Sequence, residues 1–178
     1  IEYSRSQHPG QPVIYSHSAP TSLCLAYRNI TDAEIIACAN TGGVIGLNMC
    51  PWFMVDELAE ETTPADVVNA IRYVEDLVGL AHVSLASDDV FSWQAVWKYA
   101  AESASAPDEG DLGPKALKQR NLTLQAANNK PYKSAEPARI YPAIADEMWS
   151  RGYSDTDIAN VLGGNFLRVA REVWGTAG

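Results

Sequence analysis

Residues 12–19 read PVIYSHSA, a short apolar-leaning run that ends abruptly in a histidine flanked by two serines. Short β-prone runs bounded by turn-forming residues are typical of buried strands in a parallel sheet, so we predict a strand at 13–16. His17 would then lie just past the carboxyl end of this strand, where α/β enzymes keep catalytic and metal-binding groups. The alternative is a histidine that caps the next helix or bonds to the backbone.

Two further strands are predicted, at 44–48 and 83–86, and a helix precedes each of them. The first helix begins at the capping box Thr31-Asp32-Ala33-Glu34, and the second begins at Thr63-Pro64. The side chains expected on the buried faces are Ile35, Ile36 and Ala39 in the first helix and Val67, Ile71, Val74 and Val78 in the second. This alternation indicates a βαβαβ unit with parallel strands and right-handed crossovers.

The remainder of the chain carries no comparable strand signal. We predict a helix at 92–101, a long inserted loop at about 103–137, and a helix at 140–151. Ser154 is expected to cap a further helix that stops at Gly163-Gly164, and Asn165 to cap the last one. The apolar residues assigned to the last helix are Phe166, Leu167, Val169, Ala170, Val173 and Trp174.

Three parallel strands cannot close a barrel, and both edges of such a sheet are open to pairing. The predicted helices also carry more apolar surface than three strands can cover. The simplest interpretation is that residues 1–178 are the carboxyl-terminal portion of a TIM (β/α)₈ barrel, with about three βα units plus terminal helices. The other strands would precede Ile1, and the chain opens without a methionine. The alternative is a small open α/β domain.

The composition argues against certain partners and against a zinc ribbon formed by the cysteines. The formal net charge of −9 argues against nucleic acid or an anionic membrane as a partner. The 47% hydrophobic content is enough for a core, yet no apolar run approaches the ~20 residues that span a bilayer. The three cysteines, Cys24, Cys38 and Cys50, show no zinc-ribbon spacing, and we expect reduced thiols in or near the core.

Polar groups lie at or near the carboxyl end of each predicted strand, namely His17, Asn48 and Asp88. Because the carboxyl ends of parallel strands meet at one edge, these groups should converge there. Asp88 could instead cap the next helix, but the adjacent Asp89 competes for that duty. Arg28, in the connection after the first strand, suits two-pronged binding of a carboxylate, although a surface cation is the alternative.

Two other histidines are expected to lie outside this site. His82 is six residues before Asp88, at the opposite end of the third strand, and we interpret it as structural. His8 lies in a Gln-His-Pro-Gly loop and is expected at the surface.

Several strings of this sequence resemble the membrane (renal) dipeptidase family. They are PVIYSHSA at 12–19, RNI at 28–30, SD at 87–88 and RGYSDTDIANVLGGNFLRV at 151–169. The similarity spans nearly the whole chain outside the predicted insertion and covers the later portion of a family member. It implies a zinc-dependent dipeptidase on an amidohydrolase-type (β/α)₈ barrel.

The resemblance also implies roles for particular residues. His17 matches a histidine that ligates one zinc ion of a pair. Asp88 matches an aspartate that handles the proton of the bridging water, and Arg28 matches an arginine that holds the substrate. With these we assign substrate contacts to Asn48, at the second strand end, and to Phe53, which belongs to the pair Trp52-Phe53 that stands where members often have a tyrosine. The other metal ligands of the family belong to strands expected before Ile1.

One departure from the family affects the rim of the site. Members usually show Asp-x-Asp-Gly after the last strand, whereas this chain has Asp88-Asp89-Val90-Phe91. The second acid and the glycine are absent, which puts the substrate preference in question.

Three functions therefore stand. The first is hydrolysis of dipeptides through a metal-activated bridging water, with two zinc ions in the complete protein. The second is a repurposed, non-catalytic barrel that acts as a pathway-accessory protein, and the third is an amidohydrolase acting on another small amide. The expected partners are a dipeptide or similar small substrate, the amino-terminal barrel half, in the same chain or as a separate subunit, and a second copy in a homodimer.

Overall fold

The computed structural model of the chain describes residues 1–55, 61–88 and 137–175. The helix predicted at 92–101, nearly all of the insertion predicted at 103–137, and the altered motif from Asp89 onward lie outside the described residues. No helix within the described part of the chain is both long enough and apolar enough to span a membrane.

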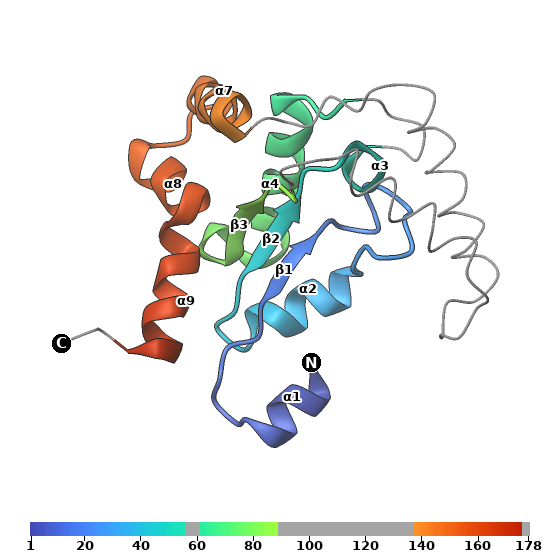
Figure 1. The fold of residues 1–178 in the computed structure, drawn as a ribbon, viewed down its shortest axis with the longest axis vertical. Helices are drawn as coiled ribbons and strands as arrows, with labels where there is room; N and C mark the ends of the chain where they lie inside the picture. The colour runs from blue at the N-terminus through green and yellow to red at the C-terminus, as the bar shows by residue number, and fades with distance from the viewer. Residues whose placement is uncertain (56–60, 89–136, 176–178) are drawn as a thin grey trace, which may run out of the picture.

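A three-stranded parallel sheet forms the centre of the fold (Figure 1). Its strands are β1 (Tyr15–Ser18), β2 (Ile45–Asn48) and β3 (Val83–Ala86), and β2 lies between the other two. The β2–β3 ladder is regular, with Ile45 opposite Val83 and Asn48 opposite Ala86, whereas the β1–β2 ladder contains a register irregularity. The predicted βαβαβ order and the parallel pairing are confirmed.

The predicted start of the first strand is wrong by two residues, because Val13 does not join the ladder. Its N–H donates to the Thr41 hydroxyl at 2.8 Å, and its carbonyl accepts from the Cys38 thiol at 3.0 Å. The ladder begins at Tyr15, whose N–H donates to the carbonyl of Val44. His17 is consequently a residue of β1 and does not follow it.

The helices begin at local signals that the sequence carries. Thr31, Thr63 and Ser154 each form a capping box with the acidic residue three positions later. The helices are α1 (Glu2–Gln7), α2 (Asp32–Ala39), α3 (Pro51–Met54), α4 (Pro64–Val78), α7 (Pro137–Ser150), α8 (Asp155–Ala159) and α9 (Asn165–Trp174). A short 3₁₀ turn, η1 (Leu80–His82), leads into β3, and a π-type segment, η2 (Asn160–Gly164), joins α8 to α9.

One continuous hydrophobic core joins the sheet to α2, α4 and α7. Its largest fully buried members include Ile35, Ile45, Leu47, Met49, Ile71, Ile144 and Met148. The buried face of α2 consists of Ile35, Cys38 and Ala39, so the prediction that Ile36 is buried is wrong, since it lies on the outer side of this short helix. All three cysteines are buried thiols outside any disulfide, as predicted, and burial raises the pKa of the Cys38 thiol to about 11.

The break between the last two helices is where the sequence predicts it, but Asn165 does not cap α9. The kink falls at Gly163, and Asn165 already has helical backbone angles. The Asn165 side chain is buried and donates from Nδ2 to the carbonyls of Leu80 and Val83, both at 2.8 Å. It therefore fastens α9 to the amino end of β3.

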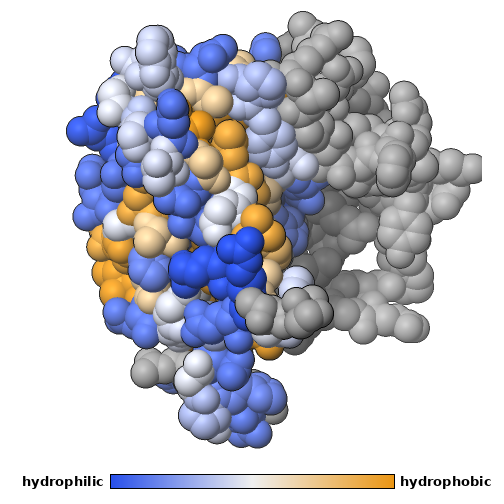
Figure 2. Space-filling model, turned by 90° about the vertical axis from the view of Figure 1, so that its left-hand side faces the viewer, coloured by the Kyte–Doolittle hydropathy of each residue, from blue (hydrophilic) through white to orange (hydrophobic). Residues whose placement is uncertain are grey.

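Much apolar surface remains exposed on the side formed by α7, α8 and α9 (Figure 2). The large hydrophobic side chains exposed there are Trp149, Leu162, Phe166, Leu167, Val173 and Trp174. At the β1 edge of the sheet, β1 pairs only with β2 among the described residues, so its outer edge has no partner strand. The exposed side chains agree with the expectation that the helices carry more apolar surface than three strands can cover. The unpaired edge agrees with the expectation that the sheet is open to further strands.

The close approach of β1 to β2 yields a first prediction. A Cβ added at Gly46 would collide with the carbonyl of Ser16. We expect Gly46→Ala to lower the free energy of unfolding by about 1–3 kcal/mol, because a backbone atom cannot move aside cheaply. The control Thr156→Ala, at an exposed position of α8, should stay within about 0.5 kcal/mol of the wild type. Chemical unfolding of the full-length protein measures both, and equal stabilities would contradict the packing described here.

Candidate active site at the carboxyl edge of the sheet

The carboxyl edge of the sheet brings together residues from three separate parts of the sequence. Asn48 is the last residue of β2, and Asp88 lies two positions after β3. Arg28 comes from the connection between β1 and α2, and Phe53 lies in α3, directly after β2. The predicted convergence of Asn48 and Asp88 is present as a direct hydrogen bond.

Three groups approach the same oxygen of Asp88, Oδ2. Nδ2 of Asn48 donates to it at 3.1 Å, Nη1 of Arg28 lies 3.6 Å away, and the Cys50 thiol lies at 3.7 Å. Asp88 is also the only non-glycine residue with positive φ in the described part of the chain, at 54°. Aspartate tolerates this left-handed conformation better than most residues, yet it still has to be held there.

Arg28 is placed by its surroundings as well as by its charge. Its Nη2 donates to the main-chain carbonyl of His17 at 3.3 Å, and its guanidinium lies 4.7 Å from the centroid of the Phe53 ring. The side chains of Arg28 and Asp88 remain 28% and 30% exposed, so the ion pair itself contributes little stability. The arginine is therefore oriented by the ring and the carbonyl and remains accessible to an anionic ligand.

An aromatic cluster lines the site beside Arg28. The Phe53 ring meets Tyr27 at 6.3 Å and Trp52 at 5.9 Å between ring centroids, both in edge-to-face geometry. Tyr27 is exposed, and the other two rings are half-buried. These rings offer an apolar wall next to a cation.

Asn29 organises the loop that carries Arg28, and the sequence reasoning did not identify it. Its Nδ2 donates to the carbonyls of Cys24 at 2.8 Å and of Phe53 at 2.7 Å, and its Oδ1 accepts from the N–H of Ala19 at 3.3 Å. One side chain thus ties the loop to α3 and to the end of β1. The only signal in the sequence is an asparagine next to the arginine, which local patterns cannot distinguish from a turn residue.

His17 presents an imidazole whose orientation is set by its neighbour. The hydroxyl of Ser16 lies 2.7 Å from Nδ1 of His17, and the residue is half-buried. A histidine with one ring nitrogen engaged in this way offers the other nitrogen to a ligand. Among the described residues, however, no group of three or more His, Cys, Asp or Glu side chains could hold a metal ion.

The end of β3 is tied to α7 as well. Burial raises the pKa of the Tyr141 phenol in α7, while hydrogen bonding with Ser87 partly opposes that rise. The Tyr141 side chain therefore lies beside the residue that precedes Asp88.

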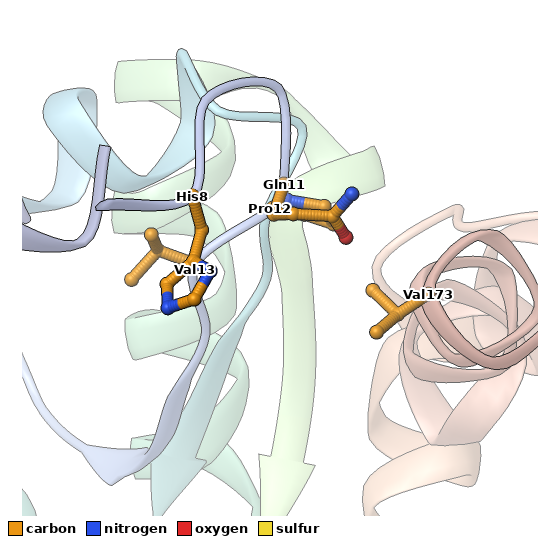
Figure 3. A pocket seen from close by; sticks show the side chains of 5 residues that line it. All are labelled: His8, Gln11, Pro12, Val13 and Val173. Carbon is orange, nitrogen blue, oxygen red and sulfur yellow. The ribbon is translucent and has the colours of Figure 1, made fainter. Parts of the chain in front are cut away.

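The other two histidines lie away from this edge, as predicted. Nδ1 of His82 lies 2.7 Å from the carbonyl of Gly43, at the amino end of the sheet. His8 is exposed and lines an open hollow of about 550 Å³ with Gln11, Pro12, Val13 and Val173 (Figure 3). The lining of this hollow is mostly apolar. The hollow lies at the amino edge of the sheet, opposite the edge that carries Asp88.

These features define an α/β protein whose polar site lies at the carboxyl edge of a parallel sheet. The family profile of the membrane dipeptidases (peptidase family M19) matches residues 6–96, about half of the chain. The chain belongs to the membrane dipeptidase family.

Individual relatives agree with this assignment. A dipeptidase of Aspergillus oryzae, aclJ, is 30% identical over 162 residues, which cover 91% of this chain and 30% of the relative. An uncharacterized protein from the pqqA 5′ region of Klebsiella pneumoniae is 25% identical over 175 residues, covering 97% of this chain and 51% of that protein. The chain thus spans between about a third and a half of the length of these relatives.

Solved structures agree on the fold. An amidohydrolase of Pseudomonas aeruginosa is similar with a TM-score of 0.62 and 24% identity, covering 93% of this chain and 46% of that one. A metallopeptidase of Rhodobacter sphaeroides, solved with a phosphinate mimic of the dipeptide L-Ala-D-Ala, is similar with a TM-score of 0.59 and 18% identity. The similarity covers 92% of this chain and 37% of the Rhodobacter protein.

The role of Asn29 can be tested without an activity assay. Asn29→Ala removes three hydrogen bonds, among them the bond to the Phe53 carbonyl and the bond from the N–H of Ala19, so we expect a loss of about 1–3 kcal/mol of stability. Amide hydrogen exchange should also accelerate across 19–30, where the loop is no longer tied to α3. The exposed Asn40, at the end of α2, provides the control Asn40→Ala. Unchanged exchange across 19–30 would show that Asn29 does not hold this loop.

Proposed function

We propose that the chain is the carboxyl-terminal part of a (β/α)₈-barrel metallodipeptidase that hydrolyses dipeptides. The observation that carries the proposal is the pairing of Asp88 with Arg28 at the carboxyl edge of the sheet, in a member of the membrane dipeptidase family. A partly exposed acid beside an oriented cation suits a substrate that has both an ammonium group and a carboxylate.

In this proposal Asp88 moves the proton of the reaction. Its carboxylate would accept a proton from the attacking water and deliver it to the leaving amine. Within the described residues all three contacts fall on Oδ2, which would leave Oδ1 available to the reactants. Oδ2 would then hold the Asp88 carboxylate in position, while Oδ1 would accept and release the proton.

Arg28 and Phe53 are assigned to the substrate. The guanidinium would bind the carboxylate of a dipeptide, or negative charge that develops on its carbonyl, through two parallel hydrogen bonds. Phe53 keeps the guanidinium in place and, with Tyr27, gives the substrate side chain an apolar surface. In this proposal these residues together would recognise both the charge and the side chain of a small peptide.

The imidazole of His17 is suited to act as a metal ligand. Its ring is oriented through Nδ1 by the serine before it, which leaves Nε2 for zinc. When bound, zinc would supply an activated water and polarise the carbonyl that is attacked. His17 is a single ligand, so the two zinc ions expected in the complete protein would need further ligands from outside the described residues.

The open faces of the structure fit a larger barrel. Within the part of the chain that the structure describes, the outer edge of β1 has no partner strand and α9 exposes hydrophobic side chains, and an isolated domain seldom leaves such surfaces uncovered. We propose that further barrel strands, in the same chain or in a separate subunit, cover them.

The proton-carrying role of Asp88 gives a direct test of function. In the full-length protein, Asp88→Asn keeps the shape of the side chain and its bond from Asn48 but removes the base. We expect kcat for dipeptide hydrolysis to fall by about 10²–10⁴-fold, with zinc content unchanged. The control is Asp155→Asn, an exposed acid in α8. Near-normal turnover by Asp88→Asn would refute the role, and a wild-type protein that cleaves no dipeptide would refute the proposed function.

The metal can be tested separately. Chelation should abolish hydrolysis, and added zinc should restore it. His17→Ala should lower the bound zinc by about one equivalent per chain, because a site that loses one of its three or four ligands binds weakly. His8→Ala, at the exposed histidine of the opposite edge, is the control and should keep its zinc. Elemental analysis by mass spectrometry measures both, and full zinc occupancy in His17→Ala would rule out His17 as a ligand.

A further inference from the structure

Asn48 has no exposed surface, and both polar atoms of its side chain are engaged. Its Oδ1 accepts from the N–H of Cys50 at 2.8 Å, and its Nδ2 donates to Oδ2 of Asp88 at 3.1 Å. A substrate cannot reach this side chain in the arrangement described. The geometry therefore favours a role behind Asp88 over the substrate contact predicted from the sequence.

The orientation of the Asn48 amide follows from chemistry. The buried N–H of Cys50 needs an acceptor, which fixes Oδ1 on that side. The NH₂ group must then point to Asp88, where an acceptor is waiting. Aspartate at position 48 would set two carboxylates against each other, and an apolar residue would leave the Cys50 N–H unsatisfied.

Asp88 needs such a restraint because its backbone is in a sparsely populated conformation. The positive φ of 54° is tolerated only when the surroundings hold it. Arg28 is partly exposed and is free to turn to a ligand, so it cannot serve as the fixed support. Asn48 is rigidly buried at the end of a regular ladder, where it lies opposite Ala86 of β3.

We propose that Asn48 is a positioning residue for the reaction: it fixes the carboxylate of Asp88 through Oδ2 so that Oδ1 faces the reactants. The inference rests on the proposed function, since it assumes that Asp88 carries the proton. The inference adds that the backbone N–H of Cys50 fixes the orientation of the Asn48 amide, so that its NH₂ group faces Asp88.

The first test measures stability and needs no activity. In the full-length protein, Asn48→Asp should lower Tm by about 4–10 °C because it sets a buried carboxylate against the partly exposed carboxylate of Asp88. The exchange variant Asn48→Asp/Asp88→Asn restores a donor and an acceptor across the same gap and should regain at least half of that loss. If neither Asn48→Asp nor Asn48→Ser folds, the exchange variant decides: a folded protein supports the pair, and failure overturns it.

The second test separates positioning from structure. Asn48→Ser keeps a hydroxyl for the Cys50 N–H but cannot reach Asp88, and we expect kcat to fall about 10–100-fold while KM changes less than about threefold. In an Asp88→Asn background the same change should lower kcat by less than about twofold, because the group it supports is already gone. The matched control is Asn165→Ser. Asn165 is a buried residue of α9 that bonds to the amino end of β3, and this variant should lose stability and keep the wild-type kcat.

Three results would overturn the proposal. They are equal losses of kcat in both backgrounds, a rise in KM at constant kcat, which would mean substrate contact, and a loss of kcat in Asn165→Ser as large as in Asn48→Ser. Failure of the proposed function gives a different pattern, in which Asp88→Asn itself retains kcat or the wild type cleaves no dipeptide. Either of those results removes the catalytic role of Asn48 too, whereas the Tm arm still reports on the hydrogen bond.

Discussion

The parallel pairing of β1, β2 and β3 is the constraint on which the site depends. It brings all three strand ends to one edge, so that Asn48 and Asp88, 40 positions apart, share a hydrogen bond. The ladder between β2 and β3 is regular over its whole length, and this regularity fixes where Asn48 stands relative to the chain that leaves β3. A slip of one residue would turn Asn48 to the other face and remove the support of the acid.

The sequence predicted the features of the fold that depend on neighbouring residues. The capping boxes, the stripe of α4 and the parallel order were predicted because each has a local signal. The errors arose where a distant partner decides the outcome. Val13 is β-prone, but its backbone groups bond to Thr41 and Cys38, more than 20 positions away, and the strand begins after it. Asn165 has the side chain of a capping residue, yet it bonds to the turn and strand around β3.

The same distinction holds for the candidate site. Residue type and position near the strand ends suggested His17, Arg28, Asn48 and Asp88, and the resemblance to a family supplied the roles proposed for them. What the sequence could not supply was the direction in which each side chain points. The buried state of Asn48, the support of Arg28 by Phe53 and the strap formed by Asn29 all depend on three-dimensional placement. These positioning contacts are therefore visible only in the structure.

The contacts around Asp88 combine one permanent partner with one exchangeable partner. Asn48 is buried and neutral, so its hydrogen bond is protected from water and from salt. Arg28 pairs with the same oxygen at 3.6 Å from a partly exposed position, where screening keeps the pair weak. In the proposed function, a ligand carboxylate would draw the guanidinium away at little cost, and the hydrogen bond from Asn48 would still hold Asp88 in place. We infer that the acid keeps its place while the cation changes partners, which is the condition for Arg28 to bind a substrate beside a carboxylate that is ready to react.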